Sequence, residues 1–334
     1  MKNILIFGYY GEKNLGDELI LENLRDCFEK RFNLGVLTSN KDYYKNLITF
    51  QKFKPLELFK GINWADIIIG GGGGIFQDKT SLRSLIYYLS ILWLSFLKGK
   101  KIYLLGQSFS PFRYAISKYL VKISLLLCEK IYLRDSFSFK YLINIGVPRE
   151  KLYIIPDIAF LSKFEKRSVN KNYVGVNFRP WKGTNINDLE NILKNLKKNE
   201  RVIFFSFQDS LDLKFFNSLS QEAKKGIDVV PYCDENFVDK FSSCKYFIGM
   251  RLHSLILASI FYIPFLAISY DEKIEAYLED LGWKFYLKIN DLDRFLPLWI
   301  QLKEEDGLDL YLRYKVEDKK KSLKEELEKL MSQI

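Results

Sequence analysis

A strand–turn–helix unit occupies residues 2–31, which read KNILIFGYYGEKNLGDELILENLRDCFEKR. Residues 2–7 form a short apolar run that predicts a strand, and residues 17–31 have the amphipathic spacing of a helix. Gly8 and Gly11 allow a tight turn between them, with exposed backbone N–H groups. This pattern is typical of the first βα unit of a parallel α/β fold.

The same alternation continues along the chain. Further strands are expected at residues 34–38, 66–69, 101–105, 131–133 and 152–155, and helices at 82–97, 113–128 and 136–144. After a polar, unpatterned stretch, strands are expected at 173–178, 202–207, 228–230, 246–248 and 265–269, and helices at 188–198, 212–224, 237–242 and 253–261. The charged tail from residue 317 predicts a terminal helix.

Two α/β domains follow from this pattern. We expect an N-terminal Rossmann-like domain over residues 1–160, a linker over 161–171, a C-terminal Rossmann-like domain over 172–290 and a helical tail over 291–334. Two such domains would face each other across a cleft, and ligands bind at the carboxyl ends of parallel strands.

The formal net charge of +10 limits the classes of partner that the chain is expected to bind. A basic surface attracts anions, but the chain has no nucleic-acid-binding motif, so anionic substrates or an anionic bilayer surface fit the charge better. The apolar stretch at residues 85–97 is too short to span a membrane, because a spanning helix needs ~20 residues. We therefore expect membrane contact, if any, to be peripheral.

The cysteines and the N-terminal residues predict the compartment. Cys27, Cys128, Cys233 and Cys244 have no metal-ligand spacing, and Met1 leads directly into a strand without a secretory signal pattern. A cytoplasmic protein without a metal is expected.

Two glycine segments follow strands in the first half. Gly8 to Glu18 departs from the dinucleotide-binding fingerprint, so a nicotinamide cofactor is not expected. Gly70 to Gly74 lacks the lysine of a phosphate-binding P-loop. So many glycines at a strand end suggest the close approach of a ligand or of another chain segment, or else a plain loop. Gln77 offers a polar group at the same place.

Cationic side chains follow several expected strands. Arg134 and Arg179 end two of them, and Arg251 and His253 follow another, within GMRLHSL. A guanidinium group suits a carboxylate or a phosphate. His253, the only histidine, can titrate near neutrality, although a lone histidine can also be structural. Lys273 can bind phosphate or be an ordinary lysine on a helix surface.

Taken in order, these segments resemble the polysaccharide pyruvyltransferase family. The matching pieces are GYYGEKNLGDE (8–18), GGGGIFQD (71–78), RDSFS (134–138), RPW (179–181), GMRLHSLILA (249–258) and SYDEK (269–273). Among its members, the chain looks most similar to cell-wall enzymes that pyruvylate N-acetylmannosamine in a lipid-linked precursor. Ser108 and Ser110 replace two family glycines, and Ile158 follows Asp157 where the family has proline.

The resemblance implies a glycosyltransferase-B-like fold, phosphoenolpyruvate as co-substrate, a lipid-linked or nucleotide-linked sugar as acceptor, and no further cofactor. It assigns His253 and Arg251 to catalysis, and Arg134, His253 and Lys273 to the donor. The residues that it assigns to the acceptor are Asn14, Asp17, Arg179, Gly72, Gly73 and Gln77.

Two alternatives remain open on the sequence. The first is a nucleotide-sugar glycosyltransferase on the same fold, in which Glu275 or Glu279 would hold the ribose. The second is a non-catalytic carbohydrate-binding or assembly protein, which the cations at the strand ends argue against.

Overall fold

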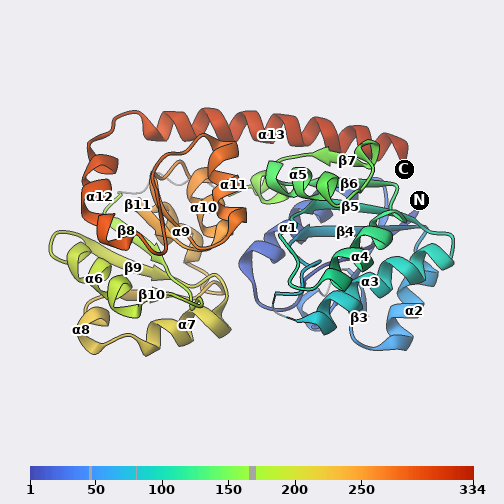
Figure 1. The fold of residues 1–334 in the computed structure, drawn as a ribbon, viewed down its shortest axis with the longest axis horizontal. Helices are drawn as coiled ribbons and strands as arrows, with labels where there is room; N and C mark the ends of the chain where they lie inside the picture. The colour runs from blue at the N-terminus through green and yellow to red at the C-terminus, as the bar shows by residue number, and fades with distance from the viewer. Residues whose placement is uncertain (45–46, 80, 165–170) are drawn as a thin grey trace. The chain divides into compact units, whose positions relative to one another are not determined.

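The computed structural model describes residues 1–44, 47–79, 81–164 and 171–334 (Figure 1). They divide into two compact units. The first unit comprises residues 1–12, 17–162 and 320–334, and the second comprises residues 13–16 and 163–319. The expected linker over 161–171 includes residues 165–170, which lie outside the described residues.

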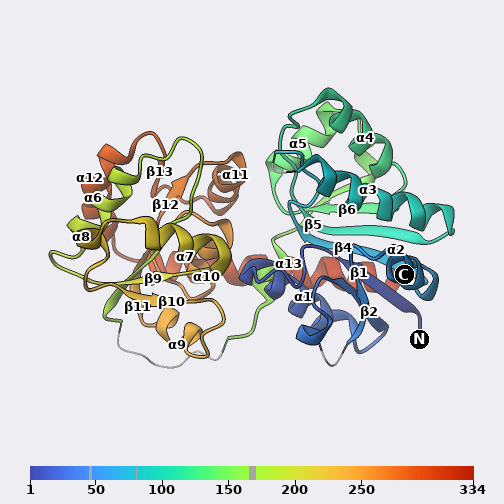
Figure 2. The same ribbon diagram turned by 90° about the horizontal axis from the view of Figure 1, so that it is seen from below.

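The described residues of the first unit form a seven-stranded parallel sheet in the order β3-β2-β1-β4-β5-β6-β7. Its strands are β1 (Asn3–Phe7), β2 (Asn33–Thr38), β3 (Ile48–Gln51), β4 (Ile67–Gly73), β5 (Lys101–Gln107), β6 (Lys130–Leu133) and β7 (Leu152–Ile154). Its helices are α1 (Leu15–Phe28), α2 (Pro55–Trp64), α3 (Leu82–Leu97), α4 (Ala115–Leu125) and α5 (Ser136–Asn144). Figure 2 shows α3, α4 and α5 on one face of this sheet and α1 on the other.

The described residues of the second unit form a six-stranded parallel sheet in the order β10-β9-β8-β11-β12-β13. Its strands are β8 (Tyr173–Asn177), β9 (Arg201–Phe205), β10 (Asp228–Val230), β11 (Cys244–Gly249), β12 (Phe265–Ser269) and β13 (Tyr286–Lys288). Its helices are α6 (Ile186–Leu196), α7 (Asp209–Ser218), α8 (Gln221–Lys224), α9 (Phe237–Ser242), α10 (Leu252–Ile260), α11 (Glu272–Leu281) and α12 (Phe295–Glu304). The last helix, α13 (Leu308–Gln333), begins in the second unit and ends in the first.

The prediction of two parallel α/β domains and a C-terminal helix is confirmed. Each sheet has its own buried core. In the first unit, aliphatic side chains of β1, β4 and β5 pack against helices α2 to α5. In the second unit, the aromatic rings of Phe205, Phe241 and Phe247 pack together, with ring centroids 4.9–6.4 Å apart. Much of the chain's high aromatic content is therefore core.

The structure corrects several element boundaries. Residues 212–224 form α7 and α8, separated at Leu219, instead of one helix. Leu161, the first residue of the expected linker, lies in a buried 3-10 helix, Ile158–Leu161. The terminal helix begins at Leu308, not at residue 317, because Leu312 and Val316 extend its buried stripe toward the N-terminus.

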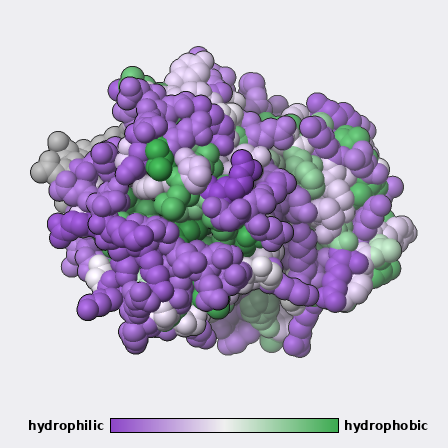
Figure 3. All heavy atoms as spheres, turned by 60° about the vertical axis from the view of Figure 1, so that its left-hand side comes forward, coloured by the Kyte–Doolittle hydropathy of each residue, from purple (hydrophilic) through white to green (hydrophobic). Residues whose placement is uncertain are grey.

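Figure 3 turns the second unit toward the viewer. The surface on this side is mostly hydrophilic, with apolar residues gathered in a hollow near its centre. A pocket of about 480 Å³ lies in the same unit between β13 and α12, where Tyr286, Pro297 and Leu298 are among its lining residues. The site residues expected from the sequence do not line this pocket.

Candidate functional site

The strand order of the second sheet reverses between β8 and β11, which are neighbours in the sheet. In doubly wound folds, ligands bind outside the carboxyl ends of the strands at such a reversal. Arg179 follows β8, Arg251 and His253 follow β11, and Lys273 follows β12. Four of the expected site residues thus lie at one edge of one sheet.

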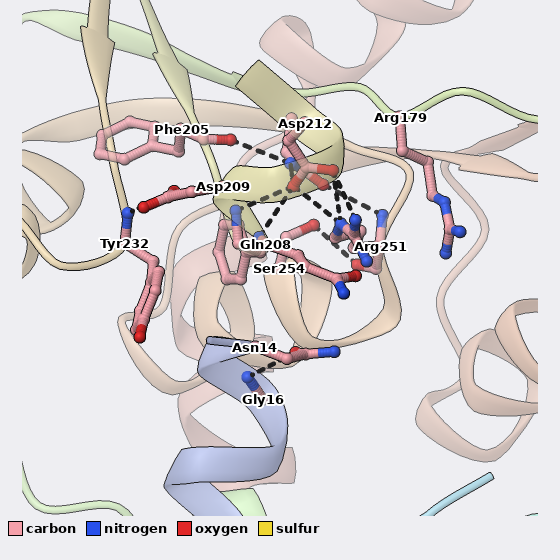
Figure 4. A network of polar contacts seen from close by, with 12 residues as sticks. Asn14, Gly16, Arg179, Phe205, Gln208, Asp209, Asp212, Tyr232, Arg251 and Ser254 are labelled. Atoms are coloured by element: carbon pink, nitrogen blue, oxygen red, sulfur yellow. Dashed lines mark hydrogen bonds and ion pairs between the residues drawn. The ribbon is translucent and has the colours of Figure 1, made fainter. Parts of the chain in front are cut away.

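A buried ion pair fixes the turn between β11 and α10 (Figure 4). The Arg251 guanidinium contacts the Asp212 carboxylate through Nε, at 2.9 and 2.8 Å from its two oxygens, and through Nη2 at 2.5 Å. Asp212 is fully buried and Arg251 nearly so. Such a pair persists only when further hydrogen bonds satisfy its atoms. Arg251 is therefore held by the protein itself.

Asp212 and Asn177 complete this network, and sequence analysis did not single out either as a site residue. Asp212 Oδ2 accepts the backbone N–H groups of Phe207 at 2.9 Å and Gln208 at 3.1 Å. Asn177 Oδ1 accepts the backbone N–H of Arg251 at 3.2 Å. The turns after β8, β9 and β11 are thereby joined. A carboxylate in the first turn of α7 was the available sequence signal, but it resembles ordinary helix capping.

His253 packs against the backbone of Gly16. A Cβ placed on Gly16 would lie 1.9 Å from the imidazole Nδ1, far inside any real contact. Residues 13–16 belong to the second unit. There the Leu15 N–H donates to the Phe207 carbonyl at 2.9 Å, and Asn14 forms an isolated antiparallel β-bridge with Gln208. The Asn14 side chain accepts the Gly16 N–H at 3.1 Å (Figure 4). Because Gly16 has no side chain, the imidazole has room to pack there. The sequence alone does not indicate this role of Gly16.

Arg179 lies among aromatic rings. Its Nη1 donates to the Tyr270 hydroxyl at 3.0 Å, and its guanidinium lies 5.4 Å from the Trp181 ring and 5.3 Å from the Tyr270 ring. The two rings themselves are 4.4 Å apart. Tyr270 directly follows β12 and Arg179 follows β8, so this contact spans the end of β11. Lys273 lies in the first turn of helix α11, where its backbone N–H donates to the N-cap residue Asp271 at 3.0 Å.

Arg134 lies in the first unit, directly after β6. Its Nη1 donates to Asp157 Oδ2 at 2.8 Å, and both side chains are buried. Asp135, not Arg134, caps helix α5, since its carboxylate accepts the Ser138 N–H at 2.6 Å. The Arg134 charge is therefore balanced within the protein, as that of Arg251 is.

The glycine tract continues strand β4 instead of forming a loop after it. Gly72 and Gly73 have φ values of +36° and +89°, a region that favours glycine. A Cβ on Gly72 would lie 2.6 Å from Ile20, and one on Gly73 would lie 3.0 Å from Asp17 Oδ1. The tract thus allows helix α1 to approach β4 closely. Gln77, half-buried, follows in the next loop.

The two serines that replace family glycines cause no backbone strain. Among the described non-glycine residues, only Lys13, Phe53 and Tyr262 have positive φ. Ser108 instead donates its backbone N–H to the Gly73 carbonyl at 2.9 Å. These positions therefore do not need glycine here.

A second polar cluster lies near the start of α1 in the first unit. Glu18 accepts the Gly11 N–H at 3.0 Å and the Tyr44 hydroxyl. Burial raises the pKa of Glu18 to about 7, against the lowering effect of these two hydrogen bonds. Buried Lys52 pairs with Glu12 at 2.9 Å. Sequence analysis did not anticipate this cluster, because β3 and the turn after it were not expected.

No helix in the described part of the chain is long and apolar enough to cross a bilayer. The same residues contain no group of three or more His, Cys, Asp or Glu side chains arranged to hold a metal ion. All four cysteines are free thiols.

The expected site residues are thus divided between the units. Asn14, Arg179, Arg251, His253 and Lys273 belong to the second unit. The first unit holds Asp17, Gly72, Gly73, Gln77 and Arg134. Within it, Asp17 and Gly73 are in contact, whereas strand β5 separates Arg134 from the glycine tract.

Solved structures share this architecture. Anabaena HepE in complex with UDP-glucose matches with a TM-score of 0.69 at 11% identity, over 100% of both chains. The UDP-GlcNAc 2-epimerase of Methanocaldococcus jannaschii gives 0.63 at 13% identity, over 92% of this chain and 94% of that one. The lipopolysaccharide outer core galactosyltransferase WaaB gives 0.60 at 12% identity, over 99% and 100%. The fold is that of glycosyltransferases of the GT-B class and of sugar-nucleotide epimerases.

Residues 14–272 match the family model described as polysaccharide pyruvyl transferase. Because this match covers most of the chain and includes Asn14, Arg134, Arg251 and His253, the chain belongs to that family. No curated protein sequence matches it.

Proposed function

We propose that the chain transfers the pyruvyl group of phosphoenolpyruvate onto two hydroxyls of a sugar and releases phosphate. The acceptor in this proposal is N-acetylmannosamine in a lipid-linked cell-wall precursor, as the sequence resemblance implies. The observation that carries the proposal is the match of residues 14–272 to the pyruvyl transferase family. Lys273, at the same sheet edge as His253, supports it, since the donor carries a carboxylate and a phosphate.

In this proposal, Arg134, His253 and Lys273 hold the donor. The remaining assigned residues, Asn14, Asp17, Arg179, Gly72, Gly73 and Gln77, serve the acceptor. Arg251 acts differently from the direct role expected of it. Its Nε and Nη2 are engaged by Asp212, so we assign it to fixing the start of α10, from which His253 projects.

The reaction balances in two additions. One sugar hydroxyl adds to C2 of phosphoenolpyruvate, and a proton goes to the CH₂ carbon, which becomes a methyl group. A second hydroxyl then adds to C2, the bond from C2 to the phosphate oxygen breaks, and the second hydroxyl proton leaves with the phosphate. His253 is suited to move these protons, because an imidazole titrates near neutral pH.

The test is incubation with phosphoenolpyruvate and a panel of sugar acceptors, with phosphate release followed over time. Mass spectrometry of the product should show a ketal, that is, addition of a pyruvyl unit with loss of water. Phosphate release that depends on an N-acetylmannosamine acceptor supports the proposal. No release with any acceptor, lipid-linked ones included, contradicts it.

A nucleotide-sugar glycosyltransferase is the second candidate function. Two observations favour it: the fold is shared with HepE, which was solved with UDP-glucose, and Glu275 lies on helix α11 beside the proposed site. The Glu275 carboxylate accepts the Ser269 hydroxyl at 3.2 Å and pairs with Lys288 at 3.2 Å, whereas Glu279 is exposed. A ribose would have to compete with these contacts. Release of UDP from UDP-sugars, without phosphoenolpyruvate, would favour this candidate.

A further inference from the structure

The chain's positive charge is concentrated in one segment. Residues 79–128 contain eight lysines and arginines and no aspartate or glutamate, within a chain whose formal net charge is +10. The segment includes helices α3 and α4, which pack against each other on the same face of the first sheet (Figure 2). The segment therefore carries most of the excess positive charge of the protein.

Helix α3 also exposes an apolar stripe. Its exposed positions are Leu82, Arg83, Ile86, Trp93, Phe96 and Leu97, so every one except Arg83 is apolar. Ile86 is 52% and Leu97 is 73% exposed. Spacings of three, four and seven residues place these side chains on one side of the helix. Surface helices ordinarily present polar residues there, and an exposed apolar patch of this kind marks an interaction surface.

Helix α4 extends the stripe. Tyr114, Ile116 and Tyr119 are exposed on or beside it, and the Trp93 indole N–H on α3 donates to Ser124 of α4 at 2.9 Å. Lysines border these side chains: Lys118 lies between Ile116 and Tyr119, and Lys98 directly follows Leu97. We call the exposed residues of α3 and α4, with their flanking lysines and arginines, the α3–α4 surface.

We infer that the α3–α4 surface docks on an anionic lipid bilayer. Aromatic and aliphatic side chains enter the interfacial region, while lysine and arginine contact the lipid headgroups, each for ~1 kcal/mol near the surface. Docking of a second copy on the same patch would place the lysines and arginines of one copy against those of the other. Binding to nucleic acid would leave the exposed leucine and isoleucine side chains without an apolar partner.

The position of this surface fits a lipid-linked acceptor, which is the part of the inference that rests on the proposed function. Both oxygens of Asp78, in the loop after β4, accept the backbone N–H groups of Arg113 and Tyr114, at 2.8 and 3.0 Å. The loop that holds Gln77 is thereby joined to the start of α4. A bilayer bound by α3 and α4 would lie beside the loop that holds Gln77, one of the acceptor residues of the first unit.

Vesicle flotation with the full chain tests the inference. The wild type should float with vesicles rich in phosphatidylglycerol and not with pure phosphatidylcholine, and high salt should reduce binding because it screens surface charge. Ile86→Glu/Leu97→Glu should weaken binding ~10-fold or more, since each side chain would otherwise be buried in lipid. The matched control, Leu310→Glu/Tyr314→Glu, changes two exposed apolar residues on α13 and should bind like the wild type.

Two double variants that each remove two lysine charges complete the test. Lys98→Gln/Lys118→Gln should weaken binding to anionic vesicles, and Lys321→Gln/Lys324→Gln, with the same change in charge on α13, should not. Circular dichroism confirms that each variant is folded. Absence of wild-type binding at low salt overturns the inference. The inference is also overturned if analytical ultracentrifugation shows that the wild type is a dimer and that Ile86→Glu/Leu97→Glu dissociates it. Retained activity on a water-soluble acceptor in the non-binding variant separates this result from failure of the proposed function.

Discussion

At the scale of single residues, the main feature is the contact between His253 and Gly16. The imidazole is half-buried, and its Nδ1 faces the glycine backbone. Sequence analysis could place His253 at a strand-to-helix turn, because the apolar run of β11 and the helical pattern after it are local signals. It could not find the partner, since residues 16 and 253 meet only through tertiary structure.

His253 provides the first prediction. His253→Ala should lower kcat by ~10²–10⁴-fold, the usual range for a general acid–base group. Phosphoenolpyruvate affinity should fall much less, because other cations remain. Steady-state kinetics and isothermal titration measure the two effects. His253→Gln keeps hydrogen bonding without titration near neutrality, so near-normal turnover in that variant would show that His253 does not carry the proton.

Gly16 provides the second prediction. In Gly16→Ala the new methyl group must displace the imidazole, so kcat should fall substantially although His253 is still present. The control is the double variant Gly16→Ala/His253→Ala. Because there is then no imidazole to displace, its kcat should match that of His253→Ala alone. Additive losses in this cycle would mean that Gly16 acts through something other than His253.

Glu18 provides a pH-dependent prediction. Its pKa is raised to about 7, so its contribution to stability is present at low pH and is lost as the pH rises through that value. Thermal unfolding should show that Glu18→Gln gains stability relative to the wild type between about pH 5 and about pH 8.5. The control is Glu57→Gln. Hydrogen bonds from Lys41 and Lys60 lower the pKa of Glu57, so its difference from the wild type should stay constant over this range. A constant difference for Glu18→Gln as well would refute the assignment.

At the scale of elements, the strongly periodic segments were predictable. Helix α5 begins and ends at the expected residues, because Asp135 caps it and Gly146 follows its end with φ of +86°. Strand β3 was not predictable, since it has four residues and lies at the sheet edge. The extension of β4 through its glycines depends on pairing with β5, as Gly71 with Leu105 shows. Such pairing outweighs the low strand propensity of glycine.

The Asp212–Arg251 pair gives the prediction at this scale, because it joins the start of α7 to the end of β11. Asp212→Asn keeps the side chain's size but leaves the buried guanidinium without its countercharge. The expected loss of stability is ~3–5 kcal/mol, measured by urea denaturation. Asp293→Asn, at an exposed position of the same unit, should change stability by no more than ~0.5 kcal/mol. Similar stability in both variants would show that the pair is not structural.

At the scale of the whole molecule, fold and family carry different information. Both sheets have the doubly wound order of strands, which the alternating sequence pattern predicted. The fold is shared with HepE, a UDP-GlcNAc 2-epimerase and WaaB, so it cannot by itself choose between donors. The choice depends on particular side chains, and among these Lys273 offers a direct test, because its ligand differs between the two candidate functions.

Binding of phosphoenolpyruvate should stabilise the folded chain. At a concentration of 100 times Kd, a ligand that binds only the folded state adds ~2.7 kcal/mol, or roughly 5–10 °C in Tm for units of this size. Lys273→Gln removes one charged contact, which should weaken binding ~10- to 100-fold and reduce the shift to about half or less. Lys245→Gln, exposed at the opposite end of β11, should keep the full shift. If UDP-glucose raises Tm and phosphoenolpyruvate does not, the chain uses the nucleotide-sugar donor, and the pyruvyl-transfer proposal is wrong.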